Sequence, residues 1–212
     1  LNAVIVVLMG IDAIITTLGM STLVVGLTSG LVNSQAIAGL SGSFASIANQ
    51  RLLFGLPISF FYGLALAILI AYVMRFTALG RHMAFVGANR EVARLAGVRV
   101  AGIRMGAYIM SGFLCGLGGM LLAATVGGFD SNSSPTYLLP ALSATFLGTA
   151  AIKAGRFNPI GTMVAIYFLV TGIVGLELLG YTGWVSDVFY GAALIIAVVI
   201  STVTRRRSLG AA

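Results

Sequence analysis

The chain has 212 residues, of which 59% are hydrophobic and only 8% are charged, and its formal net charge is +7. A soluble globular domain carries about 25% charged residues, so this composition excludes one and indicates an integral membrane protein. A net positive charge is also found in nucleic-acid-binding proteins. Here the arginines stand in loops beside apolar runs, and the preference of basic loops for the cytoplasmic side of a membrane explains that placement. Cys115 is the only cysteine, which excludes an internal disulfide and a thiolate metal cluster.

Apolar runs in the first part of the chain predict transmembrane helices, because a span needs about 20 such residues. Residues 1–11 are interpreted as the tail of an earlier span, and this apolar start suggests a fragment. Residues 12–31 form the first clear span. Residues 32–55 are rich in Ser, Asn and Gly and are predicted to lie outside the membrane, and a second span covers residues 57–74.

The stretch from Arg75 to Arg104 holds six of the chain's twelve basic residues. Short loops rich in Lys and Arg stay in the cytoplasm, so residues 76–104 are predicted to form a cytoplasmic loop. Within this loop Asn89 is a favourable N-cap, and Gly97 stands where a left-handed residue would end a helix. The pattern predicts a helix of about two turns, which is too short to be stable alone in water and must dock on something.

The predicted short helix has two distinct faces. Val92, Leu95 and Ala96 are expected to share an apolar face, while Arg90 and Arg94 share another. Two interpretations stay open with equal weight: a helix that lies on the membrane surface with its arginines reaching outward, and a docking helix for a cytoplasmic partner.

Four more apolar segments follow the basic loop. One of them, 138–152, has about 15 residues and is predicted to be a half-helix or tilted element sheltered by its neighbours. Residues 127–137 are predicted to be a polar loop, and residues 181–187 a loop with an interfacial aromatic residue. The other three segments are full spans at 105–126, 160–179 and 188–203.

The distribution of basic residues predicts the orientation. If 75–104 is inside, alternation of the spans also puts 153–159 and 205–207 inside, so that Arg51 is the one basic residue outside. Asp130 then lies on the opposite side, with Asp187. The predicted fold is an all-α polytopic bundle of about six spans, one of them short, with a cytoplasmic C-terminus.

Sequence signatures of catalysis are absent. His82 is the only histidine, so no His-based metal site or triad can be built within the chain. Lys153 is the only lysine and follows no GxxxxGK[ST] motif, so any ATP must be bound by another polypeptide and no cofactor is expected here. Glu177 is the carboxylate nearest to a span interior, which weakens the case for a proton- or sodium-coupled carrier.

Three stretches resemble a known family. Residues 87–104, GANREVARLAGVRVAGIR, resemble the cytoplasmic coupling segment of bacterial sugar ABC permeases of the ribose/xylose type. Residues 146–162, FLGTAAIKAGRFNPIGT, resemble the glycine-rich loop before the family's penultimate span, although Thr149 and Ala154 stand where many members have glycine. Residues 175–198 resemble the last loop and span.

The resemblance implies a permease domain over 1–212, from a family with about ten spans of which about four N-terminal ones are missing here. It also implies a second permease subunit, cytoplasmic ATP-binding subunits, a periplasmic sugar-binding protein and surrounding membrane lipid as partners. The implied coupling helix that contacts the ATPase comprises Asn89, Arg90, Glu91, Val92, Ala93, Arg94, Leu95, Ala96, Gly97 and Val98. The implied glycine-rich loop comprises Gly148, Thr149, Gly155, Arg156, Gly161 and Thr162.

The function predicted from the sequence is that of a permease subunit in a bacterial inner membrane. It would pass a monosaccharide by alternating access, driven by a separate ATPase. A branched-chain amino acid as cargo is the nearest alternative, and a channel or carrier that uses no ATPase is a second. A membrane-embedded enzyme is a third, but no catalytic constellation supports it.

Overall fold

The computed structural model describes residues 1–33, 35–39, 42–51, 55–131, 133–151, 157–181 and 183–210. Its contacts divide the chain into two compact units. Unit 1 comprises Leu1–Leu66 and Tyr72–Asn132, and unit 2 comprises Ala67–Ala71 and Ser133–Ala212.

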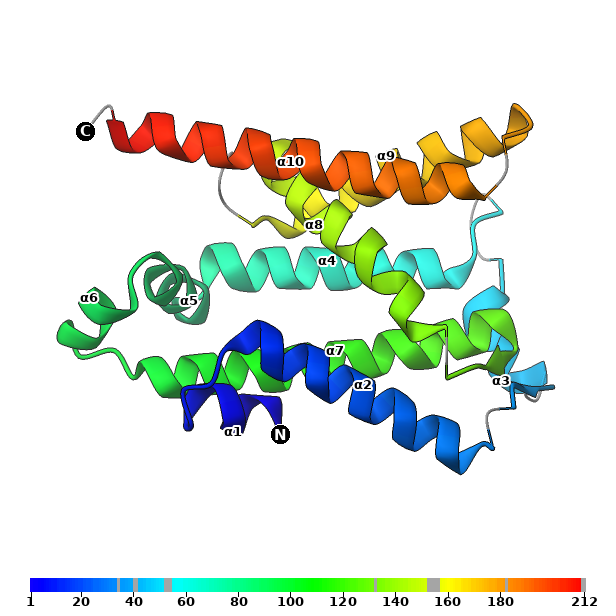
Figure 1. Ribbon diagram of the computed structural model, residues 1–212, viewed down its shortest axis with the longest axis horizontal. Helices are drawn as coiled ribbons and strands as arrows, with labels where there is room; N and C mark the ends of the chain where they lie inside the picture. Colours follow the sequence, from blue (N-terminus) through cyan, green and yellow to red (C-terminus); the bar gives the residue numbers. More distant parts are fainter. Residues whose placement is uncertain are drawn as a thin grey trace. The chain divides into compact units, whose positions relative to one another are not determined.

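Long apolar helices dominate both units (Figure 1). Among the described residues, five helices are long and apolar enough to cross a membrane, and α8 (Leu138–Ala151) is a shorter one. The five are α2 (Ala13–Leu31), α4 (Ile58–Phe76), α7 (Val100–Val126), α9 (Pro159–Leu178) and α10 (Trp184–Gly210), the last with its apolar part at Trp184–Thr202. The predicted all-α polytopic fold, with one short segment, is confirmed.

The helix boundaries follow local capping signals. Asp12 caps α2, because its carboxylate accepts hydrogen bonds from the backbone N–H groups of Ile14 (2.9 Å) and Ile15 (3.2 Å). The boundaries of α7 and α10 differ from the prediction. α7 begins at Val100, earlier than expected, and α10 begins at Trp184, so residues 184–187 form its first turn instead of a loop.

At one end of unit 1, a two-stranded sheet joins the segment after α2 to the segment after α7. Strand β1 (Ile37–Ala38) pairs antiparallel with β2 (Gly128–Phe129), which directly follows α7. Close by, the Ser29 hydroxyl at the end of α2 donates to the Ser131 hydroxyl over 2.8 Å. The C-terminal ends of α2 and α7 therefore lie at the same end of unit 1.

Helix α3 (Gly42–Asn49) packs against α7 in unit 1. The Asn49 side-chain amide donates to the carbonyls of Ala124 (3.4 Å) and Thr125 (3.3 Å) near the C-terminal end of α7, where the helix leaves carbonyls unpaired. Helix α1 (Asn2–Val7) contacts α2 and α7 and ends after six residues, so only part of the apolar 1–11 stretch is helical.

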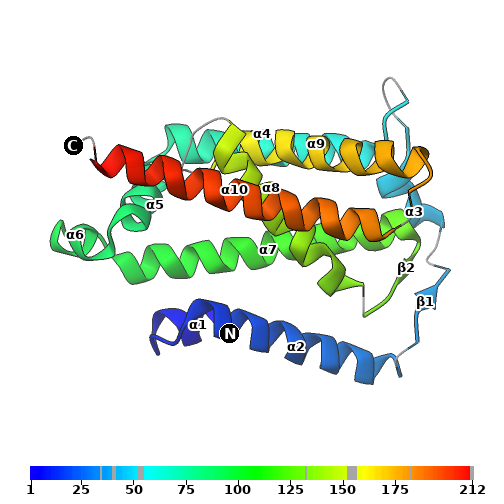
Figure 2. The ribbon, with the colours of Figure 1, turned by 45° about the horizontal axis from the view of Figure 1, so that its top comes forward.

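Two short helices join α4 to α7: α5 (Ala78–Ala88) and α6 (Arg90–Leu95) (Figure 2). Thr77 alone separates α4 from α5. Its hydroxyl donates to the Val73 carbonyl over 2.7 Å and accepts from the Gly80 N–H over 3.4 Å. Gly80 lies so close to the backbone of Met74 that a Cβ there would have no room. The turn from α4 into α5 is therefore sharp, and α5 is an element that the sequence analysis missed.

Unit 2 has a core where α8, α9 and α10 pack together, in which several small residues lie beside larger apolar ones. The fully buried Ser143 on α8 lies within hydrogen-bond distance of two carbonyls, Leu139 (2.7 Å) in its own helix and Tyr190 (2.9 Å) in α10. The other buried residues of these helices include Ala144, Thr149, Ala165, Leu169, Ile173 and Ala197. Small side chains let helix backbones approach closely, which is how helices associate in lipid.

Candidate functional site

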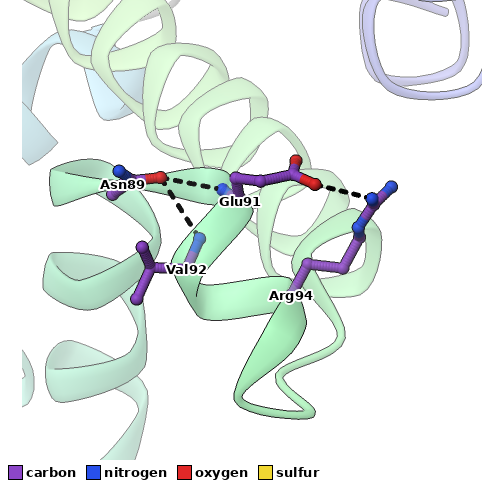
Figure 3. A network of polar contacts seen from close by, with 4 residues as sticks. All are labelled: Asn89, Glu91, Val92 and Arg94. Carbon is purple, nitrogen blue, oxygen red and sulfur yellow. Dashed lines mark hydrogen bonds and ion pairs between the residues drawn. The ribbon is translucent and has the colours of Figure 1, made fainter.

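The predicted short helix exists as α6 and begins where the sequence indicates. Asn89 is its N-cap, with the side-chain oxygen accepting hydrogen bonds from the N–H groups of Glu91 (3.0 Å) and Val92 (3.2 Å) (Figure 3). The backbone of Asn89 is extended, and its own N–H donates to the carbonyl of Phe85 in α5. One residue thus ends α5 and starts α6, which satisfies backbone donors that a helix start leaves unpaired.

Helix α6 also ends as predicted. Gly97 has φ +80, the left-handed conformation that glycine adopts without steric cost. The N–H groups of Gly97 and Val98 donate to the carbonyls of Arg94 and Ala93, both over 3.0 Å. With both ends closed by local bonds, the two-turn helix is a defined element.

The apolar residues of α6 divide between two faces. Ala93 is fully buried, and α6 contacts α5 and α7, so this face holds α6 to its own chain. Leu95 is 80% exposed, Val92 is 48% exposed and Ala96 is also exposed. The predicted apolar face of Val92, Leu95 and Ala96, hereafter the outer face of α6, is therefore uncovered.

Charge on α6 is partly neutralised within the helix. Arg94 and Glu91 form an ion pair with an N–O distance of 2.6 Å, and both side chains are largely exposed (Figure 3). An exposed pair of this kind contributes little to stability. Arg90 and Arg99 are exposed as well, so the outer face of α6 is an apolar patch with basic residues around it.

The described part of the glycine-rich block forms a close helix crossing. A Cβ on Gly148 of α8 would lie 2.5 Å from the backbone nitrogen of Thr162 in α9, and a Cβ on Gly161 would lie 2.5 Å from the Gly148 carbonyl oxygen. Thr149 is buried and donates to the Phe146 carbonyl over 2.7 Å. Gly148, Gly161 and Thr162 thus meet at the crossing of α8 and α9, and Thr149 lies in the core of unit 2.

The other two predicted loop residues, Gly155 and Arg156, lie outside the described residues. Asn158, just after them, caps α9 by accepting from the Ile160 N–H over 3.2 Å. The geometry of Gly148, Gly161 and Thr162 is that of backbone packing. A functional role of this block stays a prediction.

Candidate metal ligands do not gather in the described ranges. No three His, Cys, Asp or Glu side chains among those residues lie close enough together to hold a metal ion. His82 is exposed on α5, and Cys115 is an exposed free thiol on α7.

Comparison with known proteins identifies the family. The model of a family described as "Branched-chain amino acid transport system / permease component" matches residues 1–198. The chain belongs to this permease family. The match covers four of the five long apolar helices completely and α10 as far as residue 198, so the chain is a multi-pass membrane protein.

Several curated permeases are similar to the chain over nearly all its length. It is 30% identical to the "Autoinducer 2 import system permease protein LsrD" of Yersinia pestis (strain Pestoides F), over 99% of this chain and 64% of that protein. The same identity and coverage are found for the LsrD protein of Yersinia pseudotuberculosis (serotype O:3, strain YPIII). The chain thus spans about two thirds, 64%, of the length of these relatives. No solved structure matches it significantly.

These matches confirm the resemblance to ABC transporter permeases that the sequence suggested, and with it a bacterial inner membrane as the setting. A permease component has no need of catalytic side chains of its own. Leu95, on the outer face of α6, stands outside every long apolar helix and is 80% exposed.

Proposed function

We infer that this permease is the membrane subunit of an ABC importer that moves a monosaccharide across the inner membrane by alternating access. ATP is bound and hydrolysed by a separate cytoplasmic subunit. A second permease subunit and a periplasmic sugar-binding protein complete the assembly. The whole chain, 1–212, acts as one permease domain.

The observation that carries the proposal is the geometry of α6. Helix α6 contacts α5 and α7 and has Ala93 fully buried, while Val92 and Leu95 are exposed. An apolar helix face docks in an apolar groove of a partner. Because α6 is rigidly capped at Asn89 and Gly97, a movement of the partner would be transmitted to α5 and α7. The geometry of α6 therefore supports the proposed coupling role of residues 89–98.

A separate source of ATP energy is supported by the sequence of the chain. The single lysine, Lys153, follows no phosphate-binding loop, so the chain has no P-loop of its own. The basic residues around α6 also suit the cytoplasmic side, where the ATPase operates.

The cargo has two candidates. The family description names branched-chain amino acids, whereas the Yersinia relatives are named for autoinducer 2 import. The stretches at 87–104 and 146–162 favour the sugar branch of these permeases. A channel or carrier without an ATPase is the remaining alternative.

A transport assay separates these candidates. The permease is purified with its co-purifying subunits and reconstituted in liposomes, with ATP enclosed on the side of the ATP-binding subunit. We expect ATP-dependent uptake of a labelled monosaccharide that excess leucine does not inhibit. Uptake of leucine would indicate that the cargo is an amino acid. Uptake without ATP would contradict the ABC mechanism.

The orientation has its own test, in a Cys115→Ala background. A cysteine at the exposed Ser134 is expected to react with an impermeant maleimide added to intact cells, and a cysteine at the exposed Arg99 is not. Permeabilising the cells should make the Arg99→Cys protein react. Ala93, although it lies in the same loop, is a poor reporter because it is fully buried. The reverse labelling pattern would overturn the cytoplasmic placement of 76–104.

A further inference from the structure

The end of α4 and the helix α5 that follows it carry exposed basic and apolar side chains, hereafter the corner patch. Phe76 and Leu79 are each 62% exposed, and Phe85 is also exposed. The basic members, exposed as well, are Arg75, Arg81 and His82. All six residues lie within eleven positions, on the last turn of α4 and on α5.

The length of α4 places this patch at the membrane surface. Its 19 residues span about 28 Å at 1.5 Å per residue, close to the roughly 30 Å of a bilayer's hydrocarbon core. Phe76 is the last residue of α4, so it lies where the hydrocarbon ends. Because only Thr77 separates the helices and Gly80 packs on the Met74 backbone, the start of α5 is held at the same depth.

The charges of the corner patch lack a counter-ion in their own part of the chain. Residues 52–90 contain no Asp or Glu. The nearest acidic residue along the chain is Glu91, and it is already paired with Arg94 at 2.6 Å. The Arg75 guanidinium lies over the Phe76 ring, 5.5 Å from its centroid, which keeps the charge beside an aromatic ring at the interface.

We propose that the corner patch binds the phosphate headgroup of an anionic membrane lipid, with Arg75 and Arg81 contacting the phosphate and Phe76 and Leu79 lying against the acyl chains. Lipid is the occupant that supplies both the negative charge and the apolar contact at this depth. Bound lipid fixes the level of α5, and through Asn89 the level of α6. This proposal requires that α4 spans the membrane and does not depend on the transported cargo.

The test measures lipid retention by the full chain, purified in neutral detergent and titrated with phosphatidylglycerol or phosphatidylcholine. The wild-type protein is expected to retain phosphatidylglycerol preferentially, in native mass spectra. One basic residue near an anionic surface is worth about a fivefold change in affinity, so Arg75→Gln with Arg81→Gln should weaken phosphatidylglycerol binding about 25-fold. Phosphatidylcholine binding should change little.

Two control variants keep the result interpretable. Arg75→Lys with Arg81→Lys keeps both charges and should retain most of the phosphatidylglycerol affinity. Arg90→Gln with Arg94→Gln removes the same number of arginines from α6 and should leave lipid binding unchanged. All four side chains are exposed, so the thermal unfolding of each variant should match the wild type.

Three results would overturn the proposal. The first is an unchanged phosphatidylglycerol affinity in the Arg75→Gln, Arg81→Gln protein. The second is an equal loss in the α6 control, which would mean a general effect of net charge. The third is that the corner variant keeps its lipid but loses the co-purifying ATP-binding subunit in lipid-free detergent, which would assign the corner patch to a protein contact.

Discussion

Replacing Gly148 with leucine is expected to destabilise unit 2 by about 3 kcal/mol or more, because the new side chain has no space. Even the first added atom would lie 2.5 Å from the Thr162 nitrogen and 2.8 Å from the carbonyl carbon of Gly161. Both contacts are with backbone, which cannot rotate away as a side chain can. Helices α8 and α9 would have to separate, and the packing around Ala144 and Ala165 would be lost with them.

A matched change in the same unit isolates this effect. Gly175 also lies on a helix of unit 2, in α9, but nothing lies within 4 Å of the position that its Cβ would take. Gly175→Leu should leave the thermal unfolding temperature in detergent near that of the wild type, while Gly148→Leu lowers it strongly. Equal tolerance of both changes would show that α8 and α9 do not approach each other closely at Gly148.

Leu95→Asp is expected to abolish transport while leaving the fold intact. Leu95 is 80% exposed, so an aspartate there disturbs no contact inside the chain. In the assembly the same carboxylate would be buried in an apolar groove of the ATP-binding subunit. An unpaired buried charge costs several kcal/mol, and each 1.4 kcal/mol is about a tenfold change in affinity. Uptake should therefore fall by at least about 100-fold at an unchanged level of protein in the membrane.

A second leucine provides the control for an added charge. Leu179 follows the last residue of α9 and is 75% exposed, at the end of the helix that the proposed orientation puts outside. Leu179→Asp adds the same charge and should leave the ATPase contact unchanged. Arg99→Ala, just beyond α6, should also have little effect, since exposed charges contribute little. Equal losses in all three proteins would point to a general charge effect.

The elements predicted best from the sequence are those that local signals define. The long spans follow from apolar runs, and α2 (Ala13–Leu31) coincides with the predicted span at 12–31, with Asp12 as its N-cap. Helix α6 was predicted from Asn89 and Gly97, and both residues have the predicted capping roles. Such signals act within a few residues, so tertiary structure is not needed to recognise them.

Features that depend on contacts between distant residues were not predicted. Ala93 belonged to the predicted helix, but its burial against the chain depends on α5 and α7 being in place. The sequence showed glycines at 148 and 161, yet it could not show that they meet across two helices. Helix α5 was missed because its glycines, Gly80 and Gly87, lower helix propensity, and the close contact of Gly80 with the Met74 backbone forms only once the chain turns at Thr77.

The most direct test is the affinity between this permease and the proposed ATP-binding subunit, which would be identified among the co-purifying proteins by its GxxxxGK[ST] motif. The purified subunit is titrated onto immobilised wild-type, Leu95→Asp and Leu179→Asp permease in the same detergent. If the outer face of α6 contacts that subunit, Leu95→Asp should bind it at least about 100-fold more weakly than the wild type, whereas Leu179→Asp should bind it equally well. Wild-type affinity in the Leu95→Asp protein would contradict this proposal, because the outer face of α6 would then not be the contact between permease and ATPase.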